Sequence, residues 1–424
     1  MVRRKWRLVL YAAAAAFVSG IMVSSPAFGA DQETLDRLEK IIRQQQTQIE
    51  AQQKALEKLQ QQVEALKGQT AKATVKAATD SPAAVKTTNP KASIKLYGQV
   101  NKAVLYSDDG HNEDLYLVDN DNSSTRIGVL GSITPNERYE IGTRIEVEYQ
   151  TNPSNAVWQE DKRIDDTDFE KRHLDLWVDT YRFGKFSLGW GSTASDNIAE
   201  VDLSGTSVVG YSSIASMAGG QRFYDSNTGL LNAPSIGNVF DNLDGLSRDE
   251  RIRYDSPSFN GFTGSTSYVA DGGGDFAVRY SAQVDAFKVA AGAAYANPGS
   301  TSDSVDDQLS GSVSVLHDSG FNGTFAMGTC DYKGGRDGGF FYTKFGYRGR
   351  WCPLGVTSLS TDYGRFSDID ADGDDADTIG FQMVQDIQEW GTEAYLGYRL
   401  HKLDRNGADF DNINSFMTGM RVKF

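Results

Sequence analysis

The sequence predicts an all-β transmembrane barrel of sixteen antiparallel strands, preceded by a short α-helical coiled coil. Three observations predict it. From residue 92 to residue 424, segment after segment alternates apolar and polar side chains, as strands with one apolar face do. Aromatic residues recur at the ends of these segments, and short turns alternate with long polar loops. Residues 35 to 66 follow instead a seven-residue apolar repeat.

Composition narrows the class of protein. The 424 residues include 43 Gly, 21 Phe and 19 Tyr but only 9 Pro and 2 Cys, which is typical of many short strands joined by turns. No apolar run beyond the N-terminus reaches the ~18 residues of a membrane helix, so a helical membrane bundle is excluded. The formal net charge of -15 argues against binding to nucleic acid, which requires clustered basic residues.

Residues 1–29 have the pattern of a secretory signal peptide. A basic stretch precedes an apolar stretch over residues 8–22 and a tail of small residues. We expect cleavage after Gly29. An uncleaved anchor helix is the less favoured alternative, because the apolar stretch is shorter than a full membrane span.

Residues 31–67 are expected to form a trimeric coiled coil in the periplasm. The apolar residues at its core positions are Leu35, Leu38, Ile42, Ile49, Leu56, Leu59, Val63 and Leu66. Ile combined with Gln in the central layers is compatible with a trimer, and a solitary amphipathic helix is the alternative. Residues 68–91 are Ala, Thr, Lys and Pro without apolar periodicity, which predicts a flexible linker.

Residues 92–424 are expected to form the barrel. The first six of its strands are expected at 92–106, 125–132, 138–150, 172–182, 185–191 and 250–257. An even strand number, with short turns on one side and long loops on the other, places both barrel termini in the periplasm. Closure is required because an open edge in hydrocarbon would leave backbone groups unpaired.

A barrel of this size leaves an aqueous lumen, so inward-facing charges are candidates for the pore lining. The alternation of the strands selects Glu140, Arg126, Arg144, Arg251, Arg253, Arg279 and Lys344. The alternative is that many of them only form a solvated barrel face. The longest connection, about 192–249, has an apolar and small-residue content that predicts folding into the lumen. Glu200 and Asp202 near its start are expected to face the wall arginines and to create a transverse field at the constriction.

Three stretches give the sequence a resemblance to the general trimeric porins of Gram-negative outer membranes. They are KLYGQVNKAVLY (95–106), VDNDNSSTRIG (118–128) and GMRVKF (419–424). The resemblance implies a homotrimer in outer-membrane lipid and lipopolysaccharide, an inward third loop, and passive diffusion of small hydrophilic solutes and ions. It also implies that Phe424 belongs to the signal read by the barrel-assembly machinery, and that Arg126 and Arg144 face Glu200 and Asp202.

The coiled-coil segment and the long third loop depart from that family's pattern and leave the pore size open. They are similar to features of certain substrate-selective trimeric porins. Two alternative functions therefore stand beside general diffusion: a selective channel for small anions such as phosphate or dicarboxylates, and an envelope tether through the coiled coil. The sequence does not select between three roles for that coil: it could fix the trimer, act as a spacer, or contact peptidoglycan.

No enzyme activity and no cofactor are expected. The four histidines lie in no metal-ligand spacing, and no nucleophile elbow or phosphate loop occurs. The acidic run 368–377 begins like a calcium loop, but Ile379 stands where such a loop has Glu. We therefore expect no dedicated metal site, and only diffuse Ca²⁺ or Mg²⁺ bridging between the acidic extracellular loops and lipopolysaccharide phosphates.

Overall fold

The computed structural model describes residues 91–164, 168–231 and 234–424. All of them belong to the second of the two units into which the chain divides, residues 84–424. The expected signal peptide, the coiled coil and all but the last residue of the linker lie outside the described residues. Those expectations therefore stay predictions.

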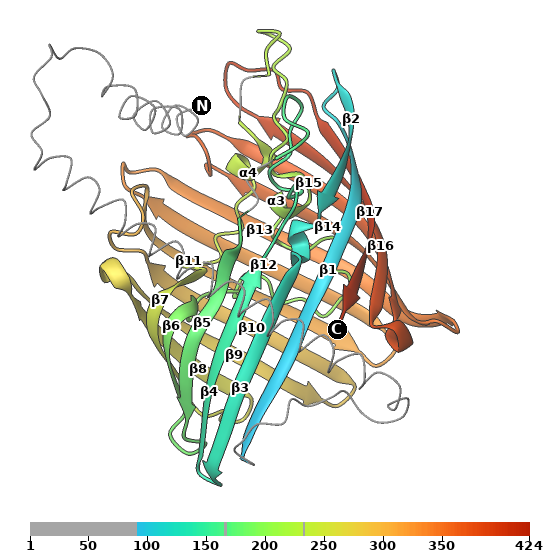
Figure 1. The fold of residues 1–424 in the computed structure, drawn as a ribbon. Helices are drawn as coiled ribbons and strands as arrows, with labels where there is room; N and C mark the ends of the chain where they lie inside the picture. Colours follow the sequence, from blue (N-terminus) through green and yellow to red (C-terminus); the bar gives the residue numbers. More distant parts are fainter. Residues whose placement is uncertain (1–90, 165–167, 232–233) are drawn as a thin grey trace, which may run out of the picture. The chain divides into compact units, whose positions relative to one another are not determined.

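The described chain forms one sheet of seventeen antiparallel strands that curls into a barrel (Figure 1). The strands are β1 (Ala92–Asp108), β2 (Glu113–Asp119), β3 (Arg126–Asn136), β4 (Tyr139–Glu148), β5 (Glu170–Asp179), β6 (Lys185–Ser192), β7 (Arg248–Asp255), β8 (Phe262–Val269), β9 (Gly274–Val284), β10 (Phe287–Asn297), β11 (Val305–His317), β12 (Phe321–Tyr332), β13 (Asp337–Cys352), β14 (Gly355–Ser367), β15 (Asp375–Ile387), β16 (Thr392–Asp404) and β17 (Ile413–Lys423).

The sheet closes because β1 has partners on both edges. One edge pairs with β17, from Gln99 opposite Lys423 to Asp108 opposite Asn414. The other edge pairs with β2 over residues 102–108 and with β3 over residues 92–99. β2 and β3 are thus the two halves of one barrel strand, and the barrel has the sixteen strands that the sequence predicted. Closure leaves no unpaired edge in hydrocarbon.

The interruption between β2 and β3 was not predicted, because the sequence placed the second strand at 125–132 alone. Residues 120–125 leave the strand pairing and form a short 3-10 turn, Asp121–Ser123. Asp119 stabilises the break by accepting hydrogen bonds from the backbone N–H of Thr125 (3.0 Å) and its hydroxyl (2.6 Å). The polar run over the break hides the alternation that would have revealed β2.

The two faces of the wall differ as the alternation predicted. On β4, the side chains of Ile141 and Ile145 point outward and are 41% and 48% exposed, whereas Glu146 and Glu148 point inward and are 6% and 8% exposed. An outward apolar band is what a bilayer requires of a barrel. Short turns join the strands where expected, with positive φ at Gly184, Asn260 and Gly320. No helix in the described ranges is long and apolar enough to cross a membrane.

The C-terminus is bound into the barrel seam. Gly98 and Phe424 exchange two backbone hydrogen bonds, each 3.0 Å long. A Cβ atom at position 98 would lie 2.6 Å from the Phe424 ring and 2.8 Å from the Arg126 carbonyl oxygen. The terminal ring therefore occupies the space where any larger residue at position 98 would place its side chain.

We predict that Gly98→Val displaces the Phe424 ring and destabilises the folded barrel by ~1–3 kcal/mol, the usual cost of overpacking. The measurement is the temperature at which the detergent-purified barrel loses its heat-modifiable migration on a gel. Gly131→Val is the matched control, because a Cβ there meets only the Thr143 methyl group, at 3.4 Å. Equal stability of the two variants would contradict the seam assignment.

Candidate functional site

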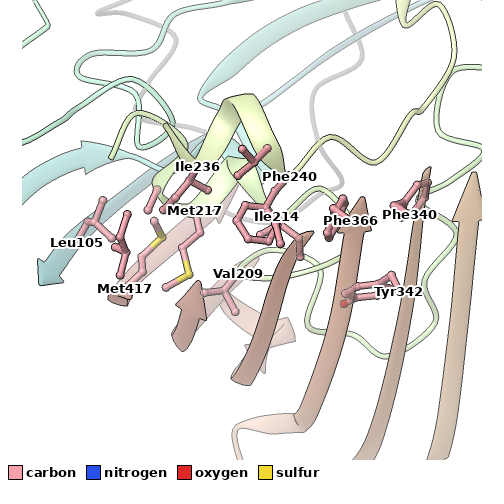
Figure 2. Close-up of a cluster of buried hydrophobic side chains, with 14 of the residues drawn as sticks. Leu105, Val209, Ile214, Met217, Ile236, Phe240, Phe340, Tyr342, Phe366 and Met417 are labelled. Atoms are coloured by element: carbon pink, nitrogen blue, oxygen red, sulfur yellow. The ribbon is translucent and has the colours of Figure 1, made fainter. Parts of the chain in front are cut away.

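The long connection between β6 and β7, residues 193–247, packs inside the barrel. It carries two short helices, α3 (Ala215–Ala218) and α4 (Ile236–Val239). Figure 2 shows its apolar side chains against those of the wall. The labelled contributors are Val209, Ile214, Met217, Ile236 and Phe240 from the loop, and Leu105, Phe340, Tyr342, Phe366 and Met417 from the wall. The loop thus lies against β1 and the later strands of the barrel.

Polar contacts fix the start of this loop to the same wall. The Asp202 carboxylate and the Lys344 ammonium form a buried ion pair of 2.7 Å, with side chains 4% and 0% exposed. Lys344 also donates to the Gly210 carbonyl oxygen at 2.7 Å. The hydroxyls of Thr206 and Ser360 are hydrogen-bonded at 2.7 Å. Because a buried charge without its partner is costly, the ion pair makes the docked position strongly preferred.

A second set of contacts ties the loop to other connections. The backbone N–H of Ser226 donates to the Asp409 carbonyl oxygen (2.8 Å), and the backbone N–H of Asp411 donates to the Tyr224 carbonyl oxygen (2.9 Å). The Tyr224 ring stacks on the imidazole of His111, with ring centroids 4.3 Å apart. The loop is therefore held both within the barrel and by the connections that follow β1 and β16.

The loop leaves a cavity of about 610 Å³ between itself and strands β3, β4, β5 and β7. Almost every residue that lines it is polar. The lining residues are Asp121, Asn122, Ser123, Ser124, Arg126, Glu148, Arg172, Asp196, Asn197, Glu200, Ser207, Tyr211, Ser216, Asp241, Asn242, Asp244, Gly245, Ser247 and Arg248.

The two sides of the cavity carry different charges: the loop side is acidic, whereas the wall side carries arginines together with Asp121 and Glu148. Arg126, Arg172 and Arg248 come from the wall, whereas four of the carboxyl groups, those of residues 196, 200, 241 and 244, come from the loop. Arg172 is bound to wall carboxylates, Glu146 at 2.8 Å and Glu148. Among the described residues, no loop carboxylate lies within 4.0 Å of these three guanidinium groups. The arginines of the wall are thus paired within the wall or unpaired, and they do not pair with the loop carboxyl groups.

Two of the four residues expected at the constriction line the cavity, namely Arg126 and Glu200. The other two, Arg144 and Asp202, do not line it and have partners elsewhere. Arg144 lies beside Asp175, with 3.7 Å between its Nε and the carboxylate. Asp202 points away from the cavity to Lys344, because the loop turns its next residues toward the opposite wall. The sequence spacing of Glu200 and Asp202 does not reveal that only Glu200 lines the cavity.

The other charged residues that were expected to face the lumen do not line the cavity. Each of them contacts another residue of the wall or of the loop. Arg251 is buried and binds Asp175 at 2.7 Å. Arg253 binds Asp255 at 2.6 Å and donates to the Thr193 carbonyl oxygen at 2.5 Å. The others follow the same pattern: Arg279 donates to the Asp196 carbonyl oxygen (2.9 Å), Lys344 is the buried partner of Asp202, and Glu140 accepts from the Tyr181 hydroxyl (3.4 Å).

Sequence reasoning missed several lining residues. Arg172 shares the parity of the outward-facing Leu174 and Leu176, so the alternation did not mark it as inward. It turns into the lumen at a β-bulge, where the register of β4 and β5 shifts between Glu146 and Val147. Arg248 lay two residues before the expected strand, so no parity was assigned to it. Asp196 and Asp244 belong to the loop, where no periodicity marks a face, and only the folded loop brings them to the cavity.

The loop carboxyl groups form one electrostatically linked cluster. Asp244 accepts hydrogen bonds from the backbone N–H groups of Asn197 (2.6 Å) and Ala199 (2.7 Å). Burial, followed by the nearby Asp196 charge, raises the pKa of Glu200 to about 7, although a hydrogen bond from Asn242 opposes the shift. Burial and the charge of Glu200 raise the pKa of Asp244 well above its ordinary value. The charge of this side therefore changes near neutral pH.

We predict that Lys344→Ala releases the loop from the wall, because the buried Asp202 carboxylate loses its only ion-pair partner among the described residues, at a cost of ~3–5 kcal/mol. The measurement is the rate of limited proteolysis within residues 193–247 of the folded barrel, which is expected to rise. Arg365→Ala is the control, since its ion pair with Asp375 has side chains 43% and 46% exposed and contributes little. An unchanged rate in Lys344→Ala would contradict the role of the ion pair.

Comparisons with known proteins agree with this architecture. The chain matches the model of the Gram-negative porin family over residues 70–406. Similar solved structures include the anion-selective porin from Comamonas acidovorans (TM-score 0.53, 16% identity, 78% of this chain and 100% of that one). Another is the outer membrane protein OmpT of Vibrio cholerae (TM-score 0.53, 14% identity, 81% and 100%). No curated protein sequence matches. The chain belongs to the Gram-negative porin family.

Proposed function

We propose that the cavity between loop 193–247 and strands β3–β7 is the narrowest part of the water-filled porin channel. Small hydrophilic solutes and ions would cross it by passive diffusion. The observation that carries this proposal is the cavity itself: charged groups of the loop and of the wall line one polar space inside a closed barrel. The apolar packing on the other side of the loop supports a single path, because it fills the lumen there.

We propose further that the channel prefers cations at slightly alkaline pH. Six carboxyl groups line the cavity, at residues 121, 148, 196, 200, 241 and 244, against three arginines. A ring of excess negative charge favours cations in a pore. The alternative of a channel for phosphate or dicarboxylates is less favoured, because a dianion would meet these carboxylates. The Comamonas porin is described as anion-selective, whereas the excess of carboxyl groups over arginines in this cavity supports the opposite preference for this chain.

The assembly proposed is a homotrimer in the outer membrane, with the coiled coil of residues 31–67 in the periplasm. The heptad pattern supports it, and OmpT of Vibrio cholerae, a similar structure, is described in a trimer form (TM-score 0.51, 15% identity, 78% of this chain and 99% of that one). Lipopolysaccharide with diffuse Ca²⁺ or Mg²⁺ at the acidic loops, and the barrel-assembly machinery reading Phe424, complete the expected partners. Tethering through the coil, with peptidoglycan as the partner, remains a second role to test by deleting residues 31–90.

We predict that the purified protein forms stepwise ion channels in a planar bilayer, and that its cation preference rises from pH 6 to pH 8. Glu200, with its pKa of about 7, is increasingly neutral below that pH and negatively charged above it. The measurement is the reversal potential under a KCl gradient at each pH.

Two variants separate the contributions to that result. Glu200→Gln removes one ionising group and is expected to flatten the pH dependence. Arg126→Gln removes a wall cation and is expected to raise the cation preference at every pH. Properly folded protein that conducts no ions would contradict the channel. A reversal potential that is constant between pH 6 and pH 8 would contradict the role of the loop carboxyl groups.

A further inference from the structure

Two charged groups in the cavity have incomplete hydrogen bonding. Arg248 forms no side-chain hydrogen bond and no ion pair with any described residue, and its Nε is buried without a partner. Asp196 is only 6% exposed, and its Oδ2 is likewise buried without a partner. Buried polar atoms in folded proteins are nearly always paired, so each exception calls for an explanation, and an ordered water or a bound molecule is one.

These two groups are of opposite charge, and both line the same cavity. They do not satisfy each other, because no ion pair within 4.0 Å joins them in the described part of the chain, and the Nε of one and the Oδ2 of the other stay without a partner. Arg279 donates to the main-chain oxygen of Asp196 and forms no ion pair within 4.0 Å with its carboxylate. The cavity therefore offers, in one polar space, a cationic and an anionic group that each have an unpartnered buried atom.

We propose that this cavity is a binding site for small zwitterionic amino acids on the diffusion path. The inference rests on the proposed channel function and adds a solute class to it. The solute carboxylate would bind the Arg248 guanidinium, whose planar fork suits a carboxylate. The solute ammonium would bind Asp196 on the loop, with Glu200 and Asp244 as further acceptors.

Other solute classes fit less well. A dicarboxylate would satisfy Arg248 but would place its second charge among the loop carboxyl groups. A simple cation would leave Arg248 unpaired. The volume of about 610 Å³ lies within the ~300–1,000 Å³ range of small-molecule sites. Binding has to stay weak enough for the solute to leave, as in any channel with an internal site.

The test compares two solutes of the same elemental formula, alanine and lactamide. Alanine is a zwitterion at neutral pH, whereas lactamide carries no charge. Each is added to both sides of a planar bilayer that holds the full-length folded protein in KCl. We expect alanine to reduce the single-channel conductance saturably, and lactamide to reduce it only in proportion to its concentration. Succinate is added separately to represent the dicarboxylates.

Variants assign the effect to the two groups. Arg248→Gln and Asp196→Asn are each expected to abolish the saturable block by alanine. Arg365→Gln removes the same charge from the exposed wall outside the cavity and is expected to keep the block. Heat-modifiable migration of each variant on a gel verifies that it is folded. If Arg248→Gln does not fold, Arg248→Lys replaces it: the variant keeps the charge but lacks the planar fork, and it is expected to weaken the saturable block by alanine. An unchanged block in Arg248→Lys would then contradict the role of the guanidinium group.

The outcomes distinguish this inference from the channel proposal. If alanine and lactamide act identically on a conducting wild-type channel, the zwitterion site is overturned and the channel remains. Saturable block by succinate and not by alanine would also overturn it, in favour of an anion site. Block by alanine that persists in both Arg248→Gln and Asp196→Asn would place the site elsewhere. Folded protein that does not conduct would remove the channel itself.

Discussion

The docking of loop 193–247 against the later half of the barrel wall is the interaction on which the site depends. Apolar loop side chains such as Val209, Met217 and Phe240 bury themselves against inward side chains of the wall. Each fully buried side chain of this kind contributes ~1.5–3 kcal/mol relative to exposure. The Asp202–Lys344 ion pair favours one docked position of the loop, because both buried charges are stable only when they are in contact. The polar cavity lies on the opposite side of the loop, beside β3, β4, β5 and β7.

Membrane insertion places a second constraint on the molecule. Every backbone group of the wall needs a partner, and pairing of β1 with β17 on one edge and with β2 and β3 on the other satisfies it. The break at 120–125 is compatible with this rule because Asp119 accepts the amide and hydroxyl hydrogen bonds of Thr125. The residues released from pairing then line the cavity. A defect in the wall thus supplies part of the polar lining.

The barrel was predictable from the sequence because strand alternation reports a repeated physical requirement, one apolar face toward lipid. Its short turns were predictable because residues such as Asn260 and Gly320 favour positive φ. The cavity was predictable only in part. Arg126 follows from strand parity, but Asp202 and Glu200 are two residues apart in an irregular loop, and only its tertiary packing separates their roles. Arg248 and Asp196 carry no local signal of a shared site.

Substituted-cysteine accessibility tests most directly whether the loop confines the channel to one side of the lumen. In a background with Cys330 and Cys352 replaced by Ser, Ser247→Cys places a thiol in the cavity, and Ser360→Cys places one beneath the loop. A cationic thiol reagent is predicted to react at position 247 and to reduce conductance there, with no reaction at position 360. Equal modification of both positions, or modification at 360 alone, would contradict the account.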